Sequence, residues 1–583
     1  MAYGVKTSPN LWVHQALHGY SDGHQQLALS AKLKPRDQKT LLVLSDSSGP
    51  GAVLNEQGYL TGYPLTQSGF FALSRTWPAK EMPRPGCVWT HTLLIDFNDL
   101  ATLNSLSSLS SLFTRPIDQH SQDKYSSPMC VVPATSSELP NSASEWAKSV
   151  VAALYARPKD RIVAKCSGNW IDETVLEIWS QQWPRLRRNF RFCTLTASDR
   201  SMEGYSFDLQ VLSNTQKNVR ARFVGAVDAE FIQLNEENWL EDVLGDLVRP
   251  DQSGLRSFLR RIGPDVAGGR EAFSNLCQLH HFLQAPSNSP DSLNEAIVLL
   301  QSEPLLKQAK SAKAFVANAA MNSLETLDAA SFQYLWENLH LVDLDTLWLH
   351  APKLGRQVLR HNPRLFAPLR DINSSERVVL ERTLDTMEMD SLIKSLGVAP
   401  QLIGIALERR PGLADQPRFW SDVKRDETVF AAVAKAELQA KAIPALLHAG
   451  RTDLADITVQ FFGALAVFEA LCRHSDFDFS LLDGWITEAA SNVDAVAAFL
   501  SSRVQIPQIV LHSIAFTLDP GSVPNLQGSD PWLTAWRNSI LPIEGKENIY
   551  LLSYFIRRVI GGNSKSQAEL LKLSFEPVHQ AAA

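Results

Sequence analysis

The sequence predicts an α+β head domain over residues 1–240, followed by a long all-α region for which a solenoid-like helical repeat is one interpretation. In the first part, short apolar runs of strand length come before most of the helical patterns. Beyond residue 240, leucine- and alanine-rich segments of helical length follow one another, separated by prolines and short polar turns. We divide this region into a middle domain, residues 241–400, and a C-terminal domain, residues 401–583.

The first two predicted strands flank a polar loop near the N-terminus. Leu11–Leu17 and Leu27–Leu33 place apolar residues at alternate positions, the pattern of half-buried strands. The loop His18–His24 joins them into a predicted hairpin. Asp22 and Gly23 tolerate the positive φ of a tight turn, so this loop has a backbone explanation that requires no ligand.

Further strands and helices complete the predicted head domain. Apolar runs predict strands at residues 40–45, 59–65, 70–77 and 87–95. The prolines of residues 78–86 exclude regular structure there, and leucines at every third position predict a helix over residues 100–113. The remaining elements are helices at residues 145–156 and 172–183, with Asp172 as a candidate N-cap, and strands at residues 161–165, 190–196 and 207–212.

Two segments of the helical region resemble each other at an offset of 48 residues. Ala351-Pro352-Lys353-Leu354 corresponds to Ala399-Pro400-Gln401-Leu402, and Pro363-Arg364-Leu365 corresponds to Pro411-Gly412-Leu413. Repeats of about this length build stacked helical hairpins, which present an extended surface to another macromolecule. Irregular helical packing with two chance matches is the alternative.

Composition limits the function classes. The 583 residues are 45% hydrophobic and 20% charged, as in ordinary soluble proteins, and the net charge of −7 gives no general reason to expect nucleic-acid binding. Six cysteines lie far apart without a CxxC pair, which favours reduced thiols and a cytoplasmic location. The sequence shows no signal peptide and no apolar run of bilayer length, so we expect no direct membrane insertion.

Several residues of the head domain permit specific chemistry. His14, His18, Asp22 and His24 could supply metal ligands, although a polar hairpin loop explains the same residues. Cys87 and His91 lie about 13 Å apart along a strand, too far to share a proton, but Cys87 could meet His18 or His24 through the fold. A lone cysteine after Pro-Gly is more often a small buried residue.

The loop after residue 44 contains Ser45, Asp46, Ser47, Ser48 and Gly49, small residues that could hold a phosphate. The chain lacks a GxxxxGK[ST] motif, so ordinary loop chemistry is the simpler account.

Two groups are candidates for contacts with a protein partner. The densest basic cluster, which we interpret as a solvated helix end and secondarily as a site for an acidic partner, consists of Arg185, Arg187, Arg188 and Arg191. We expect most of the tryptophans of the helical half in its core, and an exposed one would be a candidate binding hot spot: Trp336, Trp348, Trp420, Trp485 and Trp536.

The order of the N-terminal motifs resembles the N-terminal domain of bacterial GTPase-associated proteins. The motifs are HQALHGYSDGH from His14, LSD from Leu44, YLTGYPL from Tyr59, RTWPA from Arg75 and RPGCVWTH from Arg84. The helical remainder is similar to the middle and C-terminal regions of the same proteins. This resemblance implies a non-enzymatic adaptor, encoded beside GTPases in bacterial conflict or anti-phage defence systems, and carries over no catalytic residue.

Our leading hypothesis is a cytoplasmic adaptor that binds a partner GTPase, encoded nearby, through its helical surface and distinguishes the partner's nucleotide states. We predict no catalytic residue, no metal and no cofactor. The alternative is a metal- or Cys/His-dependent hydrolase with its site in the head domain, and a third reading is a purely structural subunit. The sequence leaves the oligomeric state open. The candidate partner- or ligand-binding residues are His18, Tyr20, Asp22, His24, Asp46, Arg84, Trp89 and His91.

Overall fold

A computed structural model shows a chain that divides into two compact units, residues 1–343 and residues 344–583. The structure describes residues 11–49, 52, 54–117, 122–131, 141–201, 205–232, 238–250, 252–284, 290–366, 374–474, 479–502, 504–518, 522–526 and 528–538.

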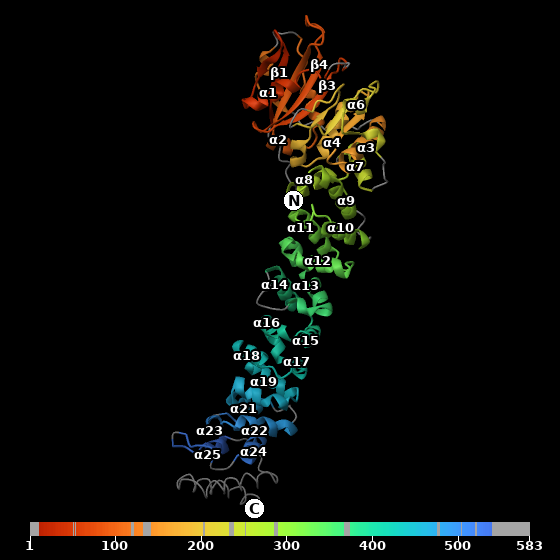
Figure 1. Ribbon diagram of the computed structural model, residues 1–583. Helices are drawn as coiled ribbons and strands as arrows, with labels where there is room; N and C mark the ends of the chain where they lie inside the picture. Colours follow the sequence, from red (N-terminus) through yellow and green to blue (C-terminus); the bar gives the residue numbers. More distant parts are fainter. Residues whose placement is uncertain are drawn as a thin grey trace, which may run out of the picture. The chain divides into compact units, whose positions relative to one another are not determined.

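The N-terminal unit is built on a mixed ten-stranded sheet with the order β10-β7-β9-β8-β3-β4-β5-β1-β2, in which β6 also pairs with β1 (Figure 1). Strands β1 to β5 pair antiparallel, whereas β7, β8, β9 and β10 form a parallel part. The two parts join where β3 pairs antiparallel with β8. The strands are β1 (Leu11–Tyr20), β2 (His24–Leu29), β3 (Tyr59–Leu65), β4 (Phe70–Pro78), β5 (Val88–Asp96), β6 (Met129–Val131), β7 (Arg161–Lys165), β8 (Phe192–Cys193), β9 (Leu209–Leu212) and β10 (Ala226–Asp228).

Period-two alternation along the strands supplies a core on each face of the sheet. In β4 and β5, Phe71 and Leu93 face the larger core, whereas Ala72 and Leu94 face a smaller one that also contains Leu41. Helices that follow the sheet continue the larger core. The helices of this unit are α1 (Pro35–Leu44), α2 (Phe97–Thr102), α3 (Asn141–Ala156), α4 (Ile171–Gln181), α5 (Pro184–Asn189), α6 (Val219–Arg222), α7 (Asn238–Val248), α8 (Leu255–Ile262), α9 (Phe273–Gln284), α10 (Pro290–Ser302), α11 (Lys310–Asn322) and α12 (Ala329–Glu337).

The predicted fold class is confirmed: a sheet with helices precedes a long, mostly helical region. The predicted domain boundaries at residues 240 and 400 stay predictions. The compact units divide at residue 343, because one continuous core runs from Val13 in β1 to Tyr334 in α12.

Two elements of the head domain differ from the sequence prediction. Residues 40–45 were expected to form a strand, but most of them belong to helix α1, whose buried residues Asp37, Thr40, Leu41 and Leu44 follow the helical period. Residues 100–113 were expected to form one helix, but they contain the end of α2 and a separate 3₁₀ turn, Ser107–Leu112. Spacing by three residues is the period of a 3₁₀ helix, which explains the misreading.

Asp172 is not the N-cap of α4, because the cap position belongs to Trp170 and carries no side-chain bond. Asp172 instead pairs with Arg75 Nη2 at 3.0 Å and accepts a hydrogen bond from Thr194 at 2.6 Å. The predicted strands at residues 190–196 and 207–212 are shorter in the structure, as β8 and β9.

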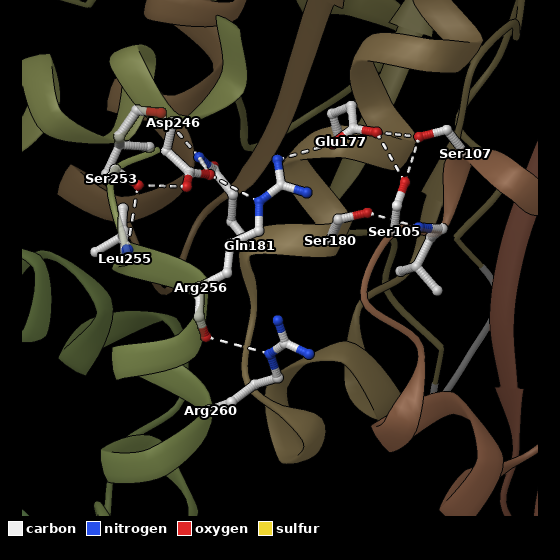
Figure 2. A network of polar contacts seen from close by, with 12 residues as sticks. Ser105, Ser107, Glu177, Ser180, Gln181, Asp246, Ser253, Leu255, Arg256 and Arg260 are labelled. Atoms are coloured by element: carbon white, nitrogen blue, oxygen red, sulfur yellow. Dashed lines mark hydrogen bonds and ion pairs between the residues drawn. The ribbon is translucent and has the colours of Figure 1, made fainter. Parts of the chain in front are cut away.

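A buried charged network joins α4 to α7 and α8 (Figure 2). Arg256 Nε lies 2.8 Å from Asp246 Oδ2, and Arg256 Nη2 lies 2.8 Å from Glu177 Oε2. All three side chains are almost completely buried. Gln181 and Ser253 donate further hydrogen bonds to Asp246, at 2.9 and 2.7 Å. The network therefore holds α7 and α8, the first helices of the helical region, against α4, which belongs to the head domain.

The C-terminal unit consists of helices in the part that the structure describes. From α14 onward, each helix packs against the second helix after it, so that even- and odd-numbered helices form two rows. These helices are α13 (Leu344–His361), α14 (Ser374–Thr386), α15 (Met389–Val398), α16 (Ile403–Arg409), α17 (Pro417–Asp422), α18 (Glu427–Lys435), α19 (Gln439–His448), α20 (Ala455–Phe462), α21 (Ala464–Arg473), α22 (Leu482–Ala490), α23 (Val493–Leu500), α24 (Gln508–Thr517) and α25 (Pro531–Asn538).

The helical repeat stays a prediction. The two segments that resemble each other take different local structures, since residues 351–354 lie inside α13 whereas Pro400–Leu402 forms a 3₁₀ turn before α16. None of the helices described here combines the length and the hydropathy that a bilayer-spanning segment requires.

The tryptophans of the helical half are only partly as expected. Trp336, Trp420 and Trp485 are buried, but Trp348 is exposed. The side chain of Trp536 lies outside the described residues.

Replacing Arg256 with alanine is expected to destabilise the N-terminal unit by about 3–5 kcal/mol, because two buried carboxylates would lose their common counter-ion. Hydrogen exchange of the α7 and α8 amides in the full chain measures the loss as reduced protection. Arg377→Ala removes an exposed pair with Glu381 and serves as the control, with an expected effect below about 1 kcal/mol. Unchanged protection of α7 and α8 in Arg256→Ala would show that the network does not hold them.

Candidate functional site

The loop between β1 and β2 is a tight turn. The strands extend to Tyr20 and His24, which face each other in the antiparallel register. Asp22 has a φ of 56° and Gly23 a φ of 140°, so both residues adopt backbone conformations that Asp and Gly tolerate best. The backbone N–H of Ser21 donates to Gly23 O at 2.9 Å. The turn therefore accounts for Asp22 and Gly23 through backbone geometry.

His18 and His24 lie together on the face of the sheet covered by α1. Their rings stack with centroids 6.2 Å apart, and His24 Nε2 donates to Ser45 Oγ at 2.8 Å, since the Ser45 hydroxyl itself donates to Leu42 O. His18 is fully buried, and neither ring nitrogen has a hydrogen-bond partner among the described residues. Burial, with a smaller contribution from His24, lowers the pKa of His18 to about 3. His18 is therefore a neutral residue of the core.

His91 lies on the opposite face, in a fully satisfied polar position. Its Nε2 donates to Gln15 Oε1 at 2.9 Å, and its Nδ1 accepts from the backbone N–H of Thr114 at 3.2 Å. The ring also makes edge contacts with Phe113 and Tyr125. Burial, and secondarily Lys124, lowers the pKa of His91 to about 3. The imidazole links β5 and β1 to the segment that follows α2.

The residues of the hydrolase alternative do not converge on one pocket. In the register of β1 and β5, His18 is opposite Thr90 and Leu17 is opposite His91, so the two imidazoles point to different faces. Asp22 is exposed at the turn, and Cys87 precedes β5. His14 bonds Ser30 Oγ at 3.1 Å. Among the described residues, no group of three or more His, Cys, Asp or Glu side chains is placed to hold a metal ion.

Trp89 is a buried packing residue. Its ring lies against Gly19, where a Cβ atom would come within 2.3 Å of Trp89 Cζ3. Its indole N–H donates to Glu81 Oε1 at 2.7 Å, and Glu81 also pairs with Arg115 at 2.8 Å. The proline-rich turn thus closes over the indole.

The candidate binding residues divide by exposure. His18, Trp89 and His91 are buried, and Tyr20 and His24 are half-buried. Only the remaining three present an exposed side chain for a direct contact: Asp22, Asp46 and Arg84.

Arg187 and Arg188 lie in the last turn of α5, as the predicted helix end requires, but of the four arginines of the cluster only Arg188 is exposed. Arg187 is fully buried and donates to Leu103 O at 2.6 Å and to Leu100 O at 3.3 Å. Burial, together with Arg260 and Arg256, lowers the pKa of Arg187 to about 9. Arg185 donates to Gly268 O at 2.6 Å. Arg188 and Arg191 lie over the rings of Phe97 and Tyr205.

Sequence reasoning missed Arg200, which connects the end of α1 to the sheet. Its Nη2 donates to Leu44 O at 3.1 Å and to Asp46 O at 3.2 Å, and its Nη1 donates to Thr61 Oγ1 at 3.2 Å. A single arginine without periodic context gives no sequence signal. These three partners are more than 130 positions away in the chain.

A polar pocket of about 140 Å³ lies at the carboxyl ends of β7, β8 and β9, where the parallel part of the sheet meets β3. Its lining includes Ser167, Asn169, Asp172 and Thr194. Such edges are common ligand positions in parallel sheets. No motif pointed to this pocket, because its lining comes from segments far apart in the sequence.

One comparison with known proteins bears on the chain. Residues 12–113 match the family described as GTPase-associated protein 1, N-terminal domain type 1. This segment is a GTPase-associated protein 1 N-terminal domain of type 1. The match confirms the resemblance predicted from the motifs and contains all eight candidate residues. No curated protein and no solved structure matches the chain.

The type 1 N-terminal domain corresponds to the antiparallel strands β1 to β5 of the sheet. The matched residues run from β1 through β5 to Phe113, whose ring contacts His91. The parallel strands and the helical region lie outside the match. Within the domain, His18 and His91 pack on opposite faces of the sheet, and Trp89 packs against Gly19 and the proline-rich turn.

Gly19→Ala is expected to destabilise the type 1 N-terminal domain by about 1–3 kcal/mol, because the new methyl group would force Trp89 to move. Thermal unfolding of the full chain measures the change. Gly245→Ala in α7, where nothing lies within 4 Å, is the matched control and is expected to be neutral or stabilising by up to about 1 kcal/mol. Equal melting temperatures for Gly19→Ala and the wild type would contradict the packing argument.

Acidification is expected to destabilise the same domain below about pH 6.5. His18 and His91 have pKa values of about 3 when folded, so the unfolded chain binds more protons between pH 6.5 and 3. Each histidine then costs about 1.4 kcal/mol per pH unit, and the full stability is present above pH 6.5. Urea unfolding from pH 7 to 4.5 tests this for wild type and His91→Gln. The variant should show a shallower slope, whereas His340→Gln, at an exposed position, should keep the wild-type slope.

Proposed function

We propose that this protein is a non-enzymatic adaptor that binds a GTPase through its helical region. The observation that carries the proposal is the match of residues 12–113 to a domain of GTPase-associated proteins. A role tied to a GTPase is therefore the plausible function class. The adaptor role goes further and is supported by the placement of the motif residues.

The burial of the motif residues favours binding over catalysis. The ring nitrogens of His91 form hydrogen bonds with Gln15 and Thr114, and the indole N–H of Trp89 forms one with Glu81, all within the domain. The polar chemistry that the motifs contain thus stabilises the sheet and its connections. In an adaptor, such side chains would hold the domain together while a separate surface binds the partner.

The helical region supplies extended surface. From α14 to α25, helices two positions apart in the chain pack together, so that many outward helix faces remain for contacts. A partner whose shape changes with its nucleotide would bind such a surface with different affinity in each state. The further proposal of anti-phage defence in the bacterial cytoplasm rests on the family resemblance alone.

Binding of the purified full chain to the GTPase encoded by the neighbouring gene tests the proposal. We expect a complex in size-exclusion chromatography and, by isothermal titration calorimetry, affinities for the GDP-bound and GTP-analogue-bound partner that differ by at least about fivefold. An unrelated GTPase of the same cell is the control and should not bind. If the neighbouring GTPase stays separate in both nucleotide states, the adaptor proposal is wrong.

A further inference from the structure

The parallel part of the sheet contains a topological switch point between β7 and β9. The chain leaves β7, passes α4 and α5 and crosses β9 to reach β8, whereas it leaves β9, passes α6 and crosses β7 to reach β10. The connections from two neighbouring strands therefore run in opposite directions. In open sheets with parallel strands, the carboxyl ends of such a strand pair are the usual position of a ligand.

The helices of the two connections cover opposite faces of the sheet. Ile162 of β7 packs into the core that contains Val175 of α4. Val163, the next residue of β7, packs instead with Leu212 of β9 and Val219 of α6. Because one connection leaves toward each face, room for a ligand is expected at the carboxyl ends of β7 and β9.

A cavity of about 450 Å³, which we call the switch-point cavity, lies at this position. Its lining comes from α3 and from residues at or just after the ends of β7, β9 and β10. Neighbouring residues of one loop line this cavity and the smaller polar pocket, since Asn214 lines the former and Ser213 the latter. The volume of the switch-point cavity is in the range of small-molecule sites.

One wall of the switch-point cavity is apolar. It includes Trp146 and Val150 on α3 and Ala164 on β7. The indole N–H of Trp146 donates to Lys165 O at 3.2 Å, and the ring makes an edge contact with Trp170, with 5.7 Å between the centroids. The indole is therefore held in place before a ligand arrives, which suits this wall to a flat ring.

Other lining residues are polar, among them Ser149, Lys165, Asn214 and Glu230. The backbone N–H of Asn214 donates to Ser167 Oγ at 3.1 Å, which joins the loops after β7 and β9. The side-chain amide of Asn214 has no hydrogen-bond partner among the described residues, so its donors and its acceptor are available. These groups suit a molecule that carries hydroxyl or amino groups around its edge.

The charges at this edge of the sheet disfavour an anionic ligand. Lys165 Nζ lies 3.1 Å from Glu230 Oε2 and 3.7 Å from Asp228 Oδ2, so two carboxylates surround one ammonium group. The first turn of α4 adds Asp172 and Glu173, which oppose an anion at that helix N-terminus. A phosphate group would therefore be repelled here.

We propose that the switch-point cavity binds a neutral nucleoside. A flat base would pack on the indole of Trp146, while its polar edge and the sugar hydroxyls would form hydrogen bonds with the Asn214 amide and the Glu230 carboxylate. This inference goes beyond the proposed function and does not depend on it, because the nucleoside binds the N-terminal unit without a GTPase.

Equilibrium dialysis of the purified full chain against adenosine, guanosine, cytidine and uridine tests this inference. We expect at least one of these nucleosides to bind with a Kd of about 1 mM or lower. The monophosphate of the same nucleoside is expected to bind about tenfold more weakly, because the carboxylates repel its phosphate. If none of the nucleosides binds, or if the monophosphate binds as tightly or more tightly, the proposal is wrong.

Variants of the full chain test whether the nucleoside lies in the switch-point cavity. Asn214→Ala removes the available amide and is expected to weaken binding by about fivefold. Ser149→Phe fills the cavity from α3 and is expected to abolish binding. Asn169→Ala is the matched control, because Asn169 is also an exposed asparagine after a parallel strand but lines the smaller pocket, and it should bind as the wild type does. Circular dichroism and the melting temperature show that each variant is folded.

The pattern among the variants distinguishes the two cavities. If Asn169→Ala weakens binding and Asn214→Ala does not, the nucleoside lies in the smaller pocket and the assignment to the switch-point cavity is wrong. A folded Ser149→Phe variant that binds like the wild type would exclude this cavity as well. Neither result affects the adaptor proposal, and a failure to bind the GTPase would leave nucleoside binding unaffected.

Discussion

The N-terminal unit depends on one buried guanidinium between two buried carboxylates. Arg256 on α8 bridges Glu177 on α4 and Asp246 on α7, in surroundings from which water is largely excluded. Two carboxylates this deeply buried would be costly without a common cation. The arrangement therefore requires the three helices to be in place together. The requirement that α4, α7 and α8 pack together is consistent with the single core that begins in the sheet and continues through α7 and the helices that follow.

Arginines elsewhere in the chain satisfy backbone carbonyls at the ends of segments. Arg187 and Arg200 do this in the N-terminal unit, for the carbonyls of Leu103 and Leu44. In the C-terminal unit, Arg410 donates to the last carbonyls of α14, and Arg451 donates to those at the end of α17. A guanidinium carries five N–H donors, which suits it to several carbonyls at once. These arginines stabilise the fold, which is why their number says little about an anionic partner.

The type 1 N-terminal domain uses its histidines as packing residues on two faces of one sheet. His18 lies under α1, and His91 lies against Phe113 on the other face. Residues that look like a functional cluster in the sequence are thus separated by the pleat of β1 and β5. Most of the motif residues therefore contribute packing inside the domain and little surface for a partner.

Local periodicity in the sequence determined the fold class, the strands β1, β3, β4 and β5, and the turn at Asp22 and Gly23, because these depend on neighbouring residues. In residues 40–45 and 100–113 the spacing of apolar residues fits more than one kind of element. A short stretch of sequence therefore predicted a strand where the structure has a helix, and one α-helix where it has a short helix and a 3₁₀ turn. The sequence predicted which residues belong to the candidate site, but not which of them are exposed. Their burial was decided by the tertiary structure, since the partners of His91 and Arg187 lie 76 and 84 positions away. The exposure of Trp348 is likewise a property of helix packing, which no local pattern contains.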